Sequence, residues 1–189
     1  MPFQSSVAAQ IGFGVVGELA YDGPMRAQPG VLDSASAANN VIGRAFSIKS
    51  GGTGSWAAGS AGAADPKPLV MQAGTAGAPF GGILANPKTY ANPGTTGGGT
   101  LANNLTLPNG TVAEFITEGD VVVEFTATTN PGDWVYYLHS TGALVTTTPG
   151  AARPANATGP IGSVERFSAV GGNIGVVHLT SSSPLAPTS

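Results

Sequence analysis

The chain has 189 residues, with seven Lys and Arg against ten Asp and Glu, so its formal net charge at pH 7 is −3. The few cationic side chains are scattered and form no stripe that could neutralise a phosphate backbone, and the absence of Cys excludes disulfides and thiolate chemistry. Only 9% of the residues are charged, while Gly and Pro number 29 and 15, a composition that predicts a neutral surface suited to contact with other proteins.

The N-terminus carries no sign of a targeting segment. Residues 1–6 lack the basic region and the apolar run of a signal peptide. No window of the sequence approaches the roughly 18 consecutive apolar residues of a membrane-spanning helix. We therefore expect a protein that is made in the cytoplasm and does not enter a membrane.

The glycines at positions 12, 14 and 17 match the G-x-G-x-x-G pattern of a dinucleotide-binding loop. Such a loop follows a buried strand and opens a helix, but Asp22-Gly23-Pro24 stops any helix shortly after Gly17. Asp33 lies near the spacing of a ribose-binding acid, yet it follows Pro29-Gly30 and is expected in a turn. We favour a bent or edge strand whose glycines let backbones approach closely.

The next segments predict one irregular element and one strand. Residues 32–40 are rich in Ala and Ser with weak apolar periodicity, so a short helix and a loop are equally favoured. Residues 41–48 are short, apolar and bounded by polar residues, as is typical of a strand.

Residues 50–100 differ in kind, with 13 Gly, 10 Ala and 5 Pro. We expect them to form a long extended loop, and the entropy cost of ordering such a loop must be offset by contacts. Its large apolar side chains include Trp56, Phe80 and Tyr90. Two interpretations remain open: these side chains fold against a neighbouring subunit, or they pack back onto this chain's own sheet.

From residue 101 onward the hydrophobic period is two, and turn residues separate short runs of Val, Ile, Thr and aromatics. Glu118-Gly119-Asp120 is expected to be a turn, and residues 140–142 and 171–173 are expected to close two hairpins. The predicted strands are 111–116, 121–126, 134–139, 143–147, 163–170 and 174–180.

These elements predict a single all-β domain, a jelly-roll-like sandwich or barrel. Along the chain we expect an N-terminal arm with the first strands over residues 1–49, the Gly/Ala/Pro-rich loop insertion over 50–100, and the main β-strand body over 101–189.

Residues that carry chemistry are few. His139 and His178 show no metal-ligand spacing, so each is interpreted as a hydrogen-bonded structural or surface histidine. The acidic cluster Glu114, Glu118, Asp120 and Glu124 resembles a glycosidase carboxylate pair only superficially, and a solvated face is favoured. We therefore expect no catalytic residue, no metal site and no cofactor.

The opening of the chain resembles the N-terminal third of structural cement proteins of tailed bacteriophages. The residues that carry this resemblance are 3–24 (FQSSVAAQIGFGVVGELAYDGP), 26–30 (RAQPG) and 38–46 (ANNVIGRAF). Residues 119–120, 132–134, 141–144 and 161–164 resemble the β-rich body of the same group and of related capsid decoration proteins. Residues 50–100 match only in their Gly- and Pro-rich character.

The resemblance implies a structural virion protein on the exterior of a phage capsid, synthesised in the bacterial cytoplasm, that cements neighbouring major capsid protein subunits and stabilises the head. Its implied partners are the major capsid protein and itself, as a homodimer or another homo-oligomer. Nucleic acid and membrane are not expected partners, and no catalytic residue is carried over. The segments expected to meet the shell are residues 3–16 and 50–100, because both are apolar, Gly-rich and poor in charge. The candidate interface residues are Phe3, Phe13, Val15, Trp56, Phe80 and Tyr90.

Two other functional classes compete with this one. A phage tail-fibre or receptor-binding β-module shares the Gly, Ala, Thr and Asn composition, but trimeric repeats and aromatic sugar platforms are not found in the sequence. A secreted polysaccharide-acting enzyme or carbohydrate-binding domain is disfavoured because no signal peptide and no carboxylate pair is recognised.

Overall fold

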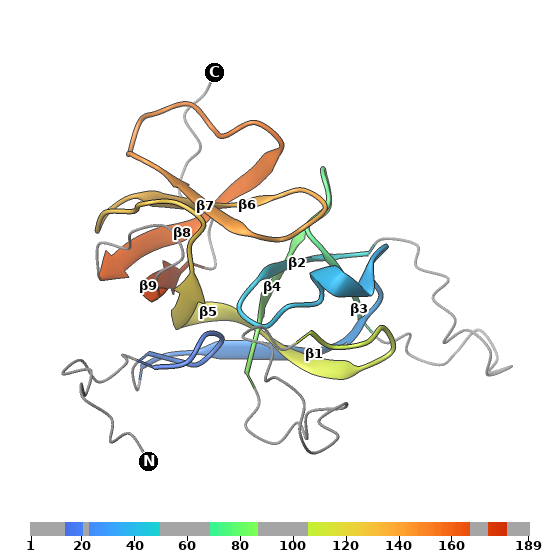
Figure 1. Ribbon diagram of the computed structural model, residues 1–189. Coiled ribbons are helices and arrows are strands. Elements are labelled where there is room, and N and C mark those ends of the chain that lie inside the picture. The colour runs from blue at the N-terminus through green and yellow to red at the C-terminus, as the bar shows by residue number, and fades with distance from the viewer. Residues whose placement is uncertain (1–13, 21–22, 50–68, 87–105, 167–173, 181–189) are drawn as a thin grey trace, which may run out of the picture.

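The computed structural model describes residues 14–20, 23–49, 69–86, 106–166 and 174–180, whose regular secondary structure is almost entirely β-strand (Figure 1). One short 3₁₀ turn, η1 (Ala37–Asn39), interrupts them. The all-β prediction is confirmed. The strands within these ranges are β1 (Arg26–Leu32), β2 (Ala45–Ile48), β3 (Val70–Ala73), β4 (Phe80–Leu84), β5 (Val112–Glu124), β6 (Trp134–Leu138), β7 (Leu144–Thr147), β8 (Ala157–Arg166) and β9 (Ile174–Leu179).

The nine strands form one mixed sheet in the order β1-β3-β2-β4-β5-β9-β8-β6-β7. An additional pairing of β1 with β5 closes the first five strands of this order into a barrel. At the other end, the parallel bridge between Phe125 and Leu144 brings β7 back to the end of β5, so the remaining strands curl into a second unit. This order is compatible with a jelly-roll-like arrangement without establishing one.

β5 is the strand that both units share. Ala113 and Phe115, in its first half, belong to the core of the first barrel. Val121 and Val123, in its second half, belong to the core of the second unit. One continuous strand therefore contributes a wall to each core.

β5 passes from the first core to the second around Gly119. The register of β5 against β1 shifts between Arg26 and Ala27, and Gly119 immediately beyond has a φ of 116°. A side chain disfavours this φ, so glycine lets the strand bend while it continues to pair. The predicted turn at Glu118-Gly119-Asp120 is wrong, because these residues lie inside one 13-residue strand.

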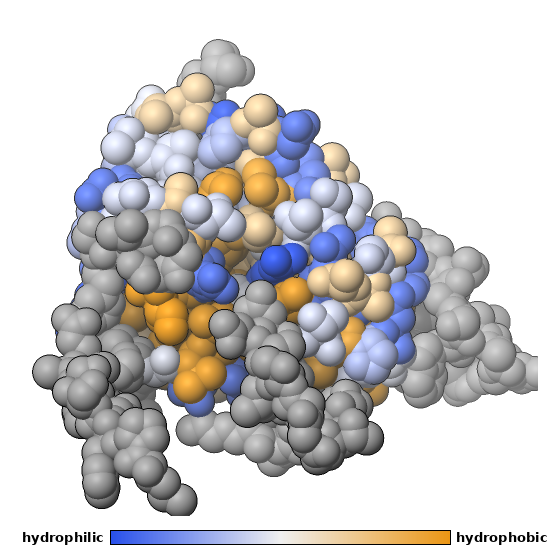
Figure 2. All heavy atoms as spheres, in the orientation of Figure 1, coloured by the Kyte–Doolittle hydropathy of each residue, from blue (hydrophilic) through white to orange (hydrophobic). Residues whose placement is uncertain are grey.

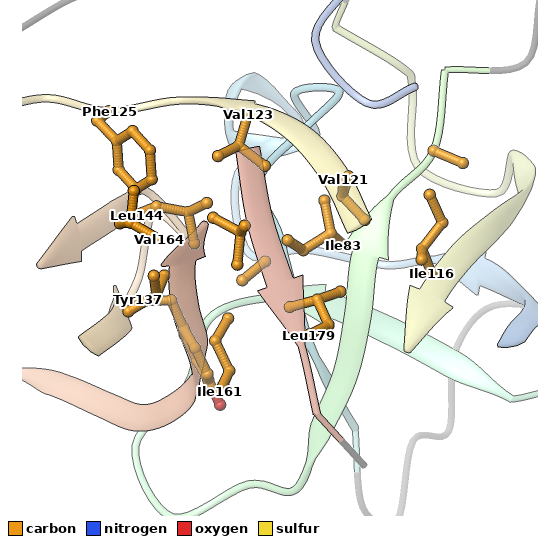
Figure 3. Packing of buried hydrophobic residues seen from close by; sticks show 14 residues of the cluster. Ile83, Ile116, Val121, Val123, Phe125, Tyr137, Leu144, Ile161, Val164 and Leu179 are labelled. Atoms are coloured by element: carbon orange, nitrogen blue, oxygen red, sulfur yellow. The ribbon is translucent and has the colours of Figure 1, made fainter. Parts of the chain in front are cut away.

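The two cores are in contact. Ala45, Ile83 and Ile116 lie in register across β2, β4 and β5. All three belong to the core of the second unit, whereas the adjacent residues Phe46, Leu84 and Phe115 belong to the core of the first barrel. Figure 3 shows Ile83 beside Val121 and Leu179. The barrel thus supplies part of the second core from its outer face.

The turn between β6 and β7 also docks on the barrel. The Ala45 N–H donates to the Gly142 carbonyl at 2.9 Å, and the Ser140 N–H donates to the Gly74 carbonyl at 2.6 Å. Asn39 Nδ2 donates to the Ser140 carbonyl at 2.7 Å. A Cβ on Gly142 would collide with the Ala45 carbonyl oxygen, so this contact requires glycine. The hairpin predicted across residues 140–142 is confirmed, and it links the two units.

The remaining C-terminal predictions agree with the structure in large part. Residues 134–139, 143–147 and 174–180 correspond to β6, β7 and β9, and the predicted strands at 111–116 and 121–126 are the two halves of β5. β8 begins before the predicted residue 163, and it pairs antiparallel with β9 as expected. The link at 171–173 lies outside the described residues.

β1 was not predicted, because Pro29 and Gly30 were expected to form a turn. Pro29 lies where β1 pairs with β5 on one side only, since the pairing with β3 begins at Val31. A strand with one free side tolerates the missing N–H of proline. A Cβ on Gly30 would lie 2.7 Å from Met71 Cγ, so this glycine marks a close approach of β1 to β3.

Residues 50–100 are not a loop throughout, which corrects the prediction for this segment. β3 lies between β1 and β2 in the sheet, and β4 lies between β2 and β5. Both strands are short, and β4 contains Gly81 and Gly82, so local composition concealed them. Residues 50–68 and 87–100 lie outside the described residues.

Candidate partner-binding surface

The segment before β1 lies along the second half of β5. The Gly17 N–H donates to the Val122 carbonyl at 2.8 Å, and the Val122 N–H donates to the Glu18 carbonyl at 2.8 Å. Leu19 forms an antiparallel bridge with Val121. A Cβ on Gly17 would lie 2.9 Å from the backbone nitrogen of Asn86. The interpretation of Gly17 as a close-approach glycine is confirmed, whereas Gly12 lies outside the described residues.

Large apolar side chains are exposed where the segment before β1 lies along β5. Among the described residues, Val15 is 53% exposed, Met25 54% and Ile174 40%. Val15 follows Gly14, whose Cβ would lie 3.2 Å from Val122 Cγ2, and Met25 packs against Gly119. Ile174 stands opposite Glu124 at the end of β5. Figure 2 shows apolar atoms gathered where the chain before β1 meets β5.

Two buried valines complete this apolar region. Val122 and Val176 are cross-strand partners on β5 and β9, and their sequence neighbours Val121, Val123 and Val177 point into the core. The pair therefore lies on the outer face, two residues along β9 from Ile174. We call the five residues Val15, Met25, Val122, Ile174 and Val176 the β5 patch.

Carboxylates surround the β5 patch. Asp120 and Glu124 flank Val122 two residues to either side along β5, and Glu118 stands opposite Arg26, the neighbour of Met25. Glu18 Oε2 accepts from the Val15 N–H at 3.4 Å. Arg166 on β8, in register with Val176, is a second cation beside Arg26. The region therefore has an apolar centre and a rim with more acidic than basic side chains, the arrangement of many protein interfaces.

His178 and Asp120 form an exposed pair at this rim, with His178 Nδ1 at 2.6 Å from Asp120 Oδ1. Ser163 stands opposite His178 on β8, so serine, histidine and aspartate lie in a row across three strands. Nucleophilic catalysis requires a hydrogen bond from the serine hydroxyl to the imidazole; within the described ranges the structure gives the histidine–aspartate contact but no serine–histidine one.

The interpretation of both histidines as hydrogen-bonded side chains is confirmed. His139 Nε2 lies 2.7 Å from Thr158 Oγ1 at the end of β6. In the described part of the chain, no group of three or more His, Asp or Glu side chains is placed to hold a metal ion. The same residues include no helix of the length and apolarity needed to cross a membrane.

The predicted interface residues are only partly described. Phe3, Phe13, Trp56 and Tyr90 lie outside the described residues, and Val15 lies in the β5 patch. Phe80 is half-buried, packs against the second core and has its ring centroid 5.8 Å from that of Tyr137. Two interpretations were open for the large apolar side chains of residues 50–100. The position of Phe80 agrees with the one in which they pack onto this chain's own sheet.

Sequence reasoning missed Met25 and Ile174. Met25 directly precedes β1, and Ile174 is the first residue of β9. Composition does not reveal which face of the sheet an apolar side chain at the start of a strand occupies.

Comparison with known proteins adds two similarities. A family model described as structural cement protein (E217 gp24/Pam3 gp6) matches residues 3–180. A chain in the solved structure of the capsid of Myoviridae Phage XM1 is similar in fold, with a TM-score of 0.56 and 17% sequence identity over 94% of this chain and 97% of that chain. At this identity the likeness shows a shared fold. No curated protein matches the chain.

Proposed function

The chain belongs to the phage structural cement protein family and is a structural protein of the virion capsid, and from this premise we propose that it binds the outer surface of the capsid and cements neighbouring major capsid protein subunits. The observation that carries the proposal is the extent of the family match, which runs from residue 3 to residue 180. A match of this extent includes both units of the sheet.

The physical chemistry of the chain supports this role. A protein that touches two subunits of a shell gains effective concentration for its second contact, so two weak contacts hold it firmly. The low charge content removes one cost of covering the surface, because burying unpaired charge is expensive. The protein is proposed to act without catalysis, to associate with itself as a homodimer, and to be made in the host cytoplasm before it joins the capsid exterior.

Co-sedimentation with capsids tests the proposal. Shells assembled from the major capsid protein without this chain are mixed with the purified protein and pelleted. We expect saturable binding at a fixed ratio to capsid subunits and a higher temperature of capsid disruption in the bound shells. A protein that remains in the supernatant at all concentrations, as a tail-fibre or receptor-binding module would, contradicts the proposal.

Deletion of residues 1–10 tests the predicted contribution of the N-terminal segment. We expect the shortened protein to occupy fewer sites on the same shells, because Phe3 and its neighbours are among the predicted contacts. Full occupancy together with unchanged heat resistance would remove residues 1–10 from the interface.

A further inference from the structure

We propose that the β5 patch and its acidic rim are a capsid-binding face, and that they receive a surface of the major capsid protein with an apolar centre and Lys or Arg side chains around it. This inference rests on the proposed function and adds to it the face of the chain and the chemistry of the partner. It adds Met25 and Ile174 to Val15 as contact residues.

The first argument is the concentration of exposed apolar side chains. Of the four large hydrophobic residues that are exposed in the described chain, Val15, Met25 and Ile174 belong to the β5 patch, and Val112 lies at the far end of β5. Scattered exposed hydrophobics need no explanation, but three of these four lie against the second half of β5, where Val122 and Val176 are buried, and such a concentration indicates an interaction surface.

The second argument is that the backbone beneath the patch is fixed. Residues 17–20 are hydrogen-bonded to β5 at Asp120 and Val122, with N–H to carbonyl contacts of 2.8 Å. β9 holds the other side of β5 over six residue pairs. A face held in this way is already shaped for its partner, so little ordering entropy is lost when it binds.

The third argument is charge. The rim carries Glu18, Glu118, Asp120 and Glu124 against Arg26, Arg166 and His178, the last of which pairs with Asp120, in a chain whose formal net charge is −3. A second copy docked on the same patch about a two-fold axis would set this acidic rim against itself. A partner with cationic side chains complements the rim, which is why we assign the patch to the capsid protein and not to self-association.

The test compares matched variants at the two ends of β5. Val15→Ser with Ile174→Ser removes two of the three exposed apolar side chains of the patch, and Val112→Ser is the control, because Val112 is also a large exposed apolar residue but lies at the opposite end of the strand. Glu124→Lys reverses a rim charge, and Glu114→Lys is its control, because both glutamates are exposed on β5. Circular dichroism melting checks that all four proteins fold.

We expect the double serine variant and Glu124→Lys to bind shells at least about tenfold more weakly, and both controls to bind as the unchanged protein does. We also expect capsid binding of the unchanged protein to weaken as salt rises, because the rim contacts are electrostatic. If the patch variants bind as the controls do while the unchanged protein still binds, the patch is not the contact and the cementing function stands. If the variants change only the oligomeric state of the free protein, the patch is a self-association surface and our assignment is overturned.

Discussion

Gly142 is the residue through which the β6–β7 turn reaches the barrel. Its φ is 69°, and a Cβ there would collide with the Ala45 carbonyl oxygen, which lies beside the hydrogen bond from the Ala45 N–H to the Gly142 carbonyl. Backbone conformation and space therefore both require glycine at this position.

Gly142→Ala is expected to lower the free energy of unfolding by about 2–4 kcal/mol, because the turn must move away from the barrel or strain against it. Gly150→Ala is the matched control: Gly150 also has a positive φ, 84°, but nothing lies within 4 Å of its added Cβ. The control should cost only about 1 kcal/mol, the penalty of the left-handed conformation. Urea denaturation of both variants measures the difference, and equal losses would show that the turn does not depend on its contact with the barrel.

β5 shows how one strand can join two cores. Its two halves face different clusters, and Ile116 carries the second core onto the outer face of the barrel. The barrel and the second unit are therefore expected to unfold together, since neither core keeps its wall if β5 is released.

Phe46→Leu tests this coupling. Phe46 is buried in the barrel, with its ring centroid 5.3 Å from that of Phe115 in an edge-to-face contact. Its loss should cost about 1–2 kcal/mol. In a Trp56→Phe background, Trp134 on β6 is the single tryptophan and reports the second unit. We expect Trp134 fluorescence and far-ultraviolet circular dichroism to give one transition, shifted together to lower denaturant by Phe46→Leu; a Trp134 transition that does not move would show independent units.

The elements that sequence could predict are those whose identity is local. Residues 134–147 hold two runs of β-branched and aromatic residues around a Gly-containing turn, and the hairpin follows from these residues alone. β1 and β4 escaped prediction because Pro29, Gly30, Gly81 and Gly82 resemble loop residues until their partners are known, and β3 escaped it because the strand has only four residues. Only the pairing explains why they are tolerated: Pro29 pairs with β5 on one side alone, and Gly30 allows the close approach of β3.

The candidate surface likewise has one part that local sequence predicts and another that depends on strand pairing. Val15 was identified from the apolar, uncharged character of the N-terminal segment, which is a property of composition. Met25 and Ile174 join it only through register, because Met25 lies against Gly119 and Ile174 stands opposite Glu124. Glu118, Asp120 and Glu124 belong to the acidic cluster predicted from sequence, but their place around an apolar centre depends on β5 being one strand instead of two strands joined by a turn.

At the scale of the whole molecule, the closed sheet suits a protein that binds others without aggregating. The barrel leaves β1 paired with both β3 and β5, and the bridge at Leu144 partly covers β7 at the other end of the strand order. Open strand edges recruit further strands without limit, whereas closed sheets restrict association to surfaces made by side chains. The β5 patch is such a surface.

The proposed bridging of two subunits makes a prediction that a simple one-to-one binder does not share. Affinity for assembled shells should exceed affinity for the unassembled major capsid protein by about 10²–10⁴, because the second contact is made within an already bound complex. Titration of labelled protein against soluble subunits and against shells, followed by fluorescence anisotropy and sedimentation respectively, measures the ratio. Weakening the first contact with Glu124→Lys should lower both affinities and leave the ratio largely unchanged, since the gain arises from geometry. Equal affinities for subunit and shell would mean that each copy holds one subunit only, and the gain in capsid stability would then need another origin.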